Sequence, residues 1–418
     1  MTLATAAALA VGNQLGTSLF SLPASLAVTV GPAALVSWVL TALGFWTLAE
    51  LFARLGGRYP ATGGPAAFVR EGFGDGWGFV TAWSYWGSVV VGNAGIALGT
   101  VAYVGFFVPA LDASPALRAA VATAMLWGCV ALNVRGVTGA GRFSFGLVLL
   151  QLIPVLLLLV ALRMFEPAHL VPFTPNGVGA IGTGVALIIW GFSGAESATV
   201  SAEEIRGDPH AVTRATRIGF FVAAGAYAVA AVALAGVLPA AELGATARPL
   251  ASVAARAVGP WGETAIAMVA IGGGLACLNG WVLLVGRLPL STAPELMPEP
   301  LRRVHPRFAT PHIALVTGTA LSTVVLVLQS TADAVSAFGQ IVLIANVGIL
   351  VPYALTAAAA WRLAPTDGRG SWRLLAVLAG LFCTGAVLAS GREAIVAGGL
   401  FVAVGAALYV LRSRTRRA

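Results

Sequence analysis

Long apolar segments alternate with short polar loops along all 418 residues of the chain. Each apolar segment is about 20 residues long, which is enough for a helix to cross the hydrocarbon core of a membrane. The pattern therefore predicts twelve membrane-spanning helices. They are expected at residues 4–29, 33–54, 77–108, 115–134, 143–164, 179–203, 213–238, 260–288, 311–328, 335–361, 371–390 and 393–411.

The first and sixth spans are interrupted by small and polar residues. The first contains Gly16, Thr17 and Ser18, and the sixth contains the run GFSGAES at residues 191–197. Non-helical backbone at membrane depth is tolerated only where it is buried in protein or lines a cavity. A pair of interrupted spans at corresponding positions points to the binding site of a transporter.

The two interrupted spans lie five spans apart, so a second copy of the first unit would have the opposite orientation in the membrane. This spacing predicts a first repeat at residues 1–164 and an inverted repeat at residues 179–361. Two peripheral helices at residues 371–411 would follow, with a basic tail at residues 412–418.

Composition supports an all-α integral membrane protein. The chain is 58% hydrophobic and only 10% charged, whereas a soluble domain carries about 25% charged residues. The first apolar segment lacks the basic start of a secretory signal, so we do not expect it to be cleaved. Cys129, Cys277 and Cys383 lie inside apolar spans, and we interpret them as buried small hydrophobic residues.

The basic residues indicate the orientation of the chain. With a cytoplasmic N-terminus, 19 of the 24 basic residues fall on the cytoplasmic side. The positive-inside rule therefore places both termini in the cytoplasm. Topology explains the net charge of +8, and we expect no nucleic acid partner. The five remaining basic residues are Arg118, Arg163, Arg248, Arg256 and Arg392.

Glu196 is the only acidic residue predicted deep within a span, since Glu50 falls near the cytoplasmic end of the second span. A carboxyl group at membrane depth is costly and suggests a function. We interpret Glu196 as a group for coupling or gating. The alternative is a hydrogen-bonded structural carboxyl that ties span six to a neighbour.

Aromatic residues near the two interruptions suggest the walls of a ligand site. Tyr85, Trp190 and Trp281 lie in spans three, six and eight. A tryptophan face attracts an ammonium or guanidinium group by about 0.5–2 kcal/mol, although these rings would also fit an ordinary core. Asn93 in span three is as well explained by a helix–helix hydrogen bond as by ligand contact. Weaker polar candidates are Asn13, Gln14, Ser88, Ser193 and Ser197.

No sequence motif suggests catalysis. The chain contains no Walker loop, no HExxH and no GxSxG motif. We therefore expect neither an enzyme nor a cofactor or metal site, and transport would be driven by a gradient or by exchange.

Five segments of the chain resemble the amino acid–polyamine–organocation transporters, and in particular the arginine/agmatine antiporter branch. They are GNQLGTSLFSLPASLA, YPATGGPAAFVREGFG, YWGSVVVGNAGIALG, WGFSGAESATV and LNGWVLLVG, in this order along nearly the whole chain. The resemblance implies a LeuT-type fold with ten core helices in a five-plus-five inverted repeat and two peripheral helices. It also implies a homodimer.

The resemblance assigns the two ends of a bound amino acid to the two interruptions. The substrate carboxylate would bind at Gly16, Thr17, Ser18 and Leu19. The α-amino group would bind at carbonyl groups of the second interruption, which correspond to Trp190 and Ser193.

The resemblance also assigns the substrate side chain and the moving parts. Trp190 would stack on the substrate, Asn93 would contact its guanidinium group, and Trp281 corresponds to a tryptophan of span eight in the family's substrate site. Tyr85 corresponds to a gating tyrosine, and Glu196 corresponds to a glutamate implicated in coupling.

The chain departs from the family pattern at several of these positions. Thr17 and Ser18 complete Gly-Thr-Ser where Gly-Ser-Gly is usual, and Gly191 and Ala345 stand in place of serines. The inner-gate region, with Ala66, Ala67 and Phe68, has no tyrosine.

The expected function is therefore exchange of an amino acid, with a cationic one such as arginine favoured, for a related amine or amino acid. Span eight lacks a convincing Ser/Thr pair for a sodium site, so a proton is the other candidate coupling ion. The alternatives are a proton-coupled importer or exporter of neutral amino acids and a nutrient sensor that no longer transports.

Overall fold

The computed structural model describes residues 3–59, 63–136, 150–151, 153–196, 199, 210–291, 297–329 and 331–415. This part of the chain is helical and contains no β-strand. Eight of its helices are long and apolar enough to cross a membrane. The prediction of an all-α membrane-spanning protein is confirmed at this level, while the count of twelve spans stays a prediction.

The first half of the chain is dominated by the long helices α3, α5 and α7. Its elements are α1 (Leu3–Leu15), α2 (Ser18–Thr29), η1 (Gly31–Ala33), α3 (Ala34–Arg58), α4 (Pro65–Phe73), α5 (Asp75–Val104), α6 (Ala110–Ala113), α7 (Pro115–Arg135), α9 (Ile153–Ala161), η2 (Leu162–Met164) and η3 (Pro167–Leu170). The predicted first span is two helices, α1 and α2. The start of the predicted fifth span lies outside the described residues.

The second half of the chain, like the first, contains both long and short helices. Its elements are α10 (Ala180–Phe192), α12 (Ala211–Val237), α13 (Ala240–Ala245), α14 (Pro249–Val258), α15 (Pro260–Ser291), α16 (Glu299–Arg302), α17 (His312–Leu328), α18 (Ala334–Arg362), α19 (Arg369–Ala389) and α20 (Arg392–Thr415). Most of the sixth span beyond Glu196 lies outside the described residues. The long helices begin and end within about one turn of the predicted spans.

Two short helices, α4 and α14, were not predicted, and they are built alike. Each begins with a proline, Pro65 or Pro249, at a position where the missing N–H is not needed. Each ends at a glycine with positive φ, 86° at Gly74 and 85° at Gly259. The ψ values near 180° place both glycines in a region that only glycine reaches easily. The chain can therefore turn sharply from each short helix into the long helix α5 or α15.

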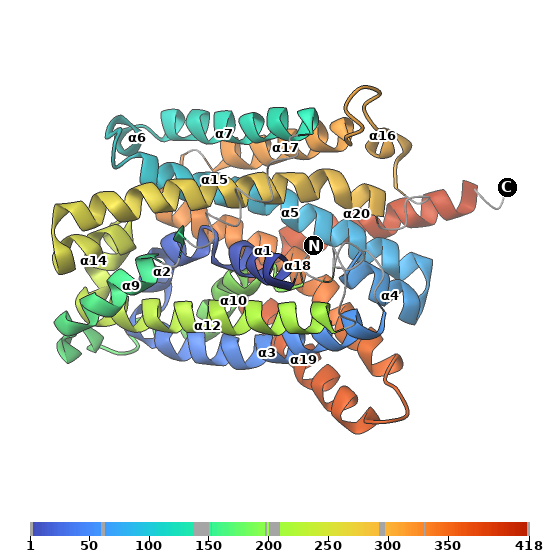
Figure 1. Cartoon of the computed structure of the whole chain (residues 1–418), viewed down its shortest axis with the longest axis horizontal. Helices are drawn as coiled ribbons and strands as arrows, with labels where there is room; N and C mark the ends of the chain where they lie inside the picture. Colours follow the sequence, from blue (N-terminus) through green and yellow to red (C-terminus); the bar gives the residue numbers. More distant parts are fainter. Residues whose placement is uncertain are drawn as a thin grey trace.

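Helix α5 occupies the centre of the bundle. In the most apolar 18-residue stretch of α5, 89% of the residues are buried inside the protein, compared with 17% in the corresponding stretch of α20. In Figure 1, α7 and α17 lie along one edge and α3 and α19 along the opposite edge, with α5, α15 and α18 between them. Glycines such as Gly92 and Gly99 let neighbouring side chains approach the α5 backbone closely.

The broken helices are held against the same central bundle. α1 packs along α12, and α10 packs along α3. Near the middle of Figure 1, α1, α2 and α10 lie between α12 on one side and α5 on the other. The ends of the broken helices therefore meet inside the protein and not at its surface.

Asp333 is the N-cap residue of helix α18. A carboxylate oxygen of Asp333 accepts hydrogen bonds from the amides of Val335 and Ser336 at 3.1 and 2.9 Å. These bonds and the Ser336 hydroxyl lower the pKa of Asp333. Asp333→Ala should lower stability by about 1 kcal/mol, measured by unfolding in detergent. Because the folded-state pKa is lowered, this contribution should persist at neutral pH and disappear as the pH falls through the carboxyl range. Asp333→Asn keeps an acceptor and is the control; equal losses in both variants would contradict the capping role.

Candidate functional site

The first helix break is centred on Gly16. Its φ of +22° is strained for any residue with a side chain, and a Cβ there would lie 2.6 Å from Sγ of Cys277. The chain resumes as α2 when the amides of Phe20 and Ser21 bond to the carbonyl of Thr17 at 3.2 and 2.9 Å. The amides of Ser18 and Leu19 have no acceptor within the described part of the chain. A helix N-terminus with free amides attracts an anion such as a carboxylate.

The second break begins where α10 ends. Ser193 is extended, with φ −60° and ψ 134°, and its hydroxyl bonds back to the carbonyl of Ile189 at 3.0 Å. Gly194 has φ +102°, and a Cβ there would lie 2.9 Å from Cβ of Asn13 in α1. The second break therefore packs against the last turn of α1, just before the first break.

Tyr227 of α12 joins the two broken helices. Its hydroxyl lies 2.6 Å from the carbonyl oxygen of Gln14 and 3.1 Å from that of Gly191. The single hydroxyl proton is therefore shared between α1 and α10. Sequence reasoning missed Tyr227, although a tyrosine in the middle of an apolar span needs a buried hydrogen-bond partner.

Trp190 and Trp281 lie side by side next to the breaks. Their ring centroids are 5.6 Å apart, with an angle of 32° between the ring planes. The Trp190 ring rests on Gly92 of α5, where a Cβ would lie 2.3 Å from a ring carbon. The structure thus brings together the two tryptophans and the α5 segment that carries Asn93.

Several buried polar atoms near the breaks and the tryptophan pair have no hydrogen-bond partner among the described residues. They include both amide atoms of Asn93, Nε1 of Trp281, Oγ1 of Thr17 and Oγ of Ser21. Buried polar atoms in proteins are nearly always hydrogen-bonded, so each exception needs an explanation. The interpretation of Asn93 as a helix–helix hydrogen-bonding residue is not supported, because its amide bonds to no described residue.

The unpaired atoms come from different helices that pack along α5. Gly99 of α5 lies against α2, so that a Cβ there would be 2.8 Å from Oγ of Ser21 and 3.4 Å from Cβ of Thr17. Asn93 lies less than two turns earlier on the same helix, beside the tryptophans. Donors and acceptors therefore gather along one stretch of α5, between the start of α2 and the end of α10.

Glu196 links the second break to α5. Its side chain is fully buried, and Oε1 accepts a hydrogen bond from the Tyr85 hydroxyl at 2.6 Å. Oε2 accepts from the amide of Gly194 at 3.1 Å, and the Tyr353 hydroxyl faces the same carboxyl. The residues predicted separately for coupling and gating are thus direct partners. Glu50 is also buried, at 6% exposure, two turns before the end of α3, so Glu196 is not the only buried carboxyl.

The side chains of three candidate residues have other surroundings. The side chains of Ser18 and Leu19 line a small apolar cavity between α2, α3 and α12, away from the tryptophan pair. The hydroxyl of Ser88, a weaker candidate, bonds to the carbonyl of Ala345 at 2.8 Å and holds α5 to α18. The Ser88 hydroxyl therefore has a structural role in this arrangement.

Cys277 was interpreted from the sequence as a packing residue only. It is free and buried as expected, but its sulfur lies against the Gly16 break, where it would be 2.6 Å from a Cβ added to Gly16. It lies one helical turn before Trp281 on α15, and this spacing could have identified it as a neighbour of the site. Among the described residues, no group of three His, Cys, Asp or Glu side chains is placed to hold a metal ion.

Known proteins with similar sequences are membrane transporters. A family described as amino acid permease matches residues 1–407. An arginine/ornithine antiporter of Pseudomonas aeruginosa is 30% identical over 370 residues, which cover 84% of this chain and 76% of that protein. A cadaverine/lysine antiporter of Escherichia coli is 29% identical over 354 residues, which cover 82% of this chain and 79% of that protein. An uncharacterized transporter of Mycobacterium tuberculosis is 30% identical over an alignment of 422 residues, which covers 99% of this chain and 91% of that protein.

Proposed function

Since the chain belongs to the amino acid permease family, whose members are multi-pass membrane transporters and not enzymes, we propose that it is a secondary antiporter. It exchanges an amino acid, with a cationic one such as arginine favoured, for a related amine or amino acid. Two similar proteins are named as antiporters of arginine and ornithine and of cadaverine and lysine. Exchange of cationic substrates is therefore the reaction that these relatives favour.

The observation that carries the proposal is the set of buried, unpaired polar atoms beside the Trp190–Trp281 pair. The free amides of Ser18 and Leu19 at the start of α2 would hold a carboxylate, because the helix dipole favours negative charge there. Carbonyl groups at Trp190 and Ser193, where α10 ends, would accept from an α-amino group.

The substrate side chain would lie between the tryptophans and α5. A guanidinium or ammonium group gains about 0.5–2 kcal/mol on a tryptophan face, and Oδ1 of Asn93 is an unused acceptor. Glu196 is the described carboxyl closest to the breaks, and Tyr85 and Gly194 already bond to its two oxygens. The positive charge would therefore be bound by ring faces and an amide, without a carboxylate partner.

A second candidate is proton-coupled transport of neutral amino acids. The buried Glu196 is a titratable group at the second break, which suits protonation linked to movement of α10. The Ser18 side chain also stands where the family pattern has its second glycine, at the carboxylate end, which favours a different substrate. A sensor that has lost transport is the remaining alternative, and it would bind substrate without flux.

We also propose the architecture that this function needs. An inverted repeat of residues 1–164 and 179–361 is supported by the paired packing of α1 on α12 and α10 on α3, and by the matching helices α4 and α14. In this arrangement the bundle that carries the breaks rocks against the remaining helices. A homodimer and cytoplasmic termini, in the inner membrane of a bacterium, complete the proposal.

A counterflow screen in proteoliposomes tests the substrate class. Vesicles loaded with arginine should take up labelled arginine, lysine or the amines agmatine and putrescine, and empty vesicles should not. Leucine and methionine serve as neutral competitors. If leucine or methionine exchanges and no cationic compound does, the cationic assignment is wrong. Binding without any flux would instead favour the sensor.

A further inference from the structure

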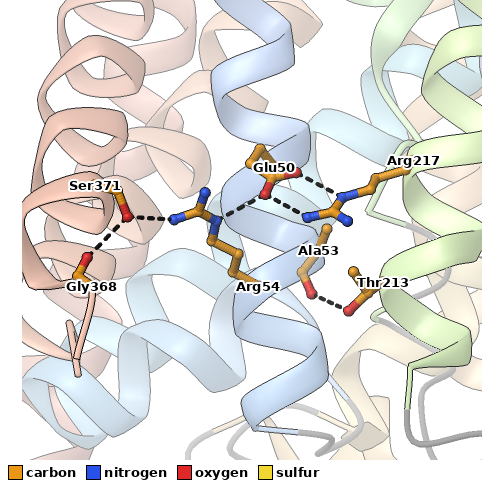
Figure 2. Close-up of polar contacts among 7 residues, drawn as sticks. All are labelled: Glu50, Ala53, Arg54, Thr213, Arg217, Gly368 and Ser371. Atoms are coloured by element: carbon orange, nitrogen blue, oxygen red, sulfur yellow. Dashed lines mark hydrogen bonds and ion pairs between the residues drawn. The ribbon is translucent and has the colours of Figure 1, made fainter. Parts of the chain in front are cut away.

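A second polar cluster lies on the outer surface of the bundle, near the C-terminal end of α3 and the N-terminal ends of α12 and α19. Glu50 of α3 accepts from Arg217 of α12 through Nε at 2.9 Å and Nη2 at 2.7 Å. It also accepts from Nε of Arg54 at 2.8 Å. Nη1 of Arg54 donates to the hydroxyl of Ser371 in α19 at 3.1 Å. Figure 2 shows these four side chains converging from the three helices.

The cluster carries an excess positive charge. Two guanidinium groups share one carboxylate, and within the described residues no second carboxylate pairs with either arginine. The side chain of Glu50 is only 8% exposed, whereas those of Arg54 and Arg217 are 27% and 45% exposed. The carboxylate is therefore covered while the two cations remain accessible.

The arginines have hydrogen-bond donors left over. A guanidinium has five N–H donors in a planar fork that matches a carboxylate or phosphate. Arg217 uses two toward Glu50, and Arg54 uses one toward Glu50 and one toward Ser371. The Nη1 group of Arg217 and the Nη2 group of Arg54 have no acceptor among the described residues and remain available for an anion.

An apolar surface adjoins the two arginines. In all three helices it lies on the side of the cluster that faces the middle of the membrane. The groove over the cluster has a volume of about 510 Å³ and is lined by the four polar residues together with Trp46, Phe221, Leu374 and Leu375. Trp46 lies one turn from Glu50, Phe221 one turn from Arg217, and Leu374 and Leu375 one turn from Ser371. In each helix these apolar residues lie about 6 Å closer to the middle of the helix than the polar residue does.

This arrangement matches one kind of ligand. We propose that the groove formed by α3, α12 and α19 binds an anionic phospholipid such as phosphatidylglycerol. The phosphate lies between Arg54 and Arg217, and an acyl chain follows Phe221 and Leu374. Phe221 and Leu374 are 59% and 61% exposed, so an acyl chain would cover apolar surface that a small soluble anion leaves bare. The bound lipid would hold α19 to α3 and α12, which pack on the broken helices.

Lipid retention on the full chain tests the proposal. The protein is purified in detergent, titrated with phosphatidylglycerol or phosphatidylcholine, and the bound lipid is counted by native mass spectrometry. Each arginine near an anionic lipid surface contributes enough to change affinity about fivefold. Arg217→Gln and Arg54→Gln should each weaken phosphatidylglycerol binding by about this factor and leave phosphatidylcholine unchanged. Arg135→Gln, which removes an exposed arginine from the last turn of α7, is the matched control and should change nothing.

A second variant separates lipid binding from a structural clamp. Glu50→Gln raises the net charge of the cluster, so phosphatidylglycerol should bind more tightly, by a similar factor, even if the protein loses stability. Unchanged lipid affinity in this variant and in both arginine variants would overturn the proposal. Inorganic phosphate and the deacylated headgroup should compete weakly; if either displaces the lipid at equal concentration, the groove is a site for soluble anions and the lipid assignment is wrong.

Discussion

Trp190→Leu is expected to weaken substrate binding at least tenfold. The substitution removes the aromatic face beside the unpaired Asn93 amide, and with it a cation–π contribution of up to about 2 kcal/mol. Leucine keeps an apolar side chain against Gly92, so the helix contact between α10 and α5 is largely retained. Binding of arginine and of its competitors is measured by calorimetry on the purified protein, and exchange by counterflow.

The control for this variant is Trp77→Leu. Trp77 is 53% exposed at the start of α5, far along the helix from Asn93, so its loss should leave affinity unchanged. If Trp190→Leu binds arginine as tightly as the native protein does, Trp190 is a core residue and the aromatic site is wrongly assigned. If leucine affinity falls as much as arginine affinity, the ring contributes apolar contact and not recognition of a cation.

Glu196→Gln is expected to flatten the dependence of transport rate on pH. Glutamine has the shape of glutamate but cannot take up or release the proton that a coupling role requires. It also replaces the charge-assisted bond from Tyr85, worth about 1.5–3 kcal/mol, by a weaker neutral one. Slower exchange is therefore expected together with loss of the pH profile. Flux into proteoliposomes at a series of internal and external pH values gives both quantities.

Tyr85→Phe separates proton coupling from structural support. It removes the 2.6 Å hydrogen bond to Glu196 and leaves the carboxyl in place. If Glu196 couples transport to protons, the Tyr85→Phe variant should transport more slowly, and its rate should still depend on pH. The Tyr353 hydroxyl would then be the hydroxyl group left beside Glu196. A native pH profile in Glu196→Gln would remove the coupling role and leave the alternative of a structural carboxyl at the second break.

Several residues of the candidate site are identifiable from the amino-acid pattern alone. Gly16 and Gly194 interrupt apolar runs where a membrane helix would otherwise continue, and both have the positive φ that such interruptions imply. Glu196 is identifiable because a carboxyl in an apolar span is costly wherever its neighbours lie. Trp190 and Trp281 are weaker predictions, since the chain has 11 tryptophans and their pattern does not distinguish a site from a core.

The sequence by itself determined the membrane class, the approximate helix ends and the two breaks, because each of these depends on hydrophobicity or backbone freedom within one segment. Only the tertiary structure decided which side chains meet. Tyr85 lies 111 residues from Glu196, and Glu50 lies 167 residues from Arg217. A hydrogen bond forms only when packing brings two atoms within about 3 Å, and a shift of one residue along either helix turns the side chain to another face. The helix break at Gly16 was therefore predictable from its own sequence, but its contacts with Cys277 and with the second break were not.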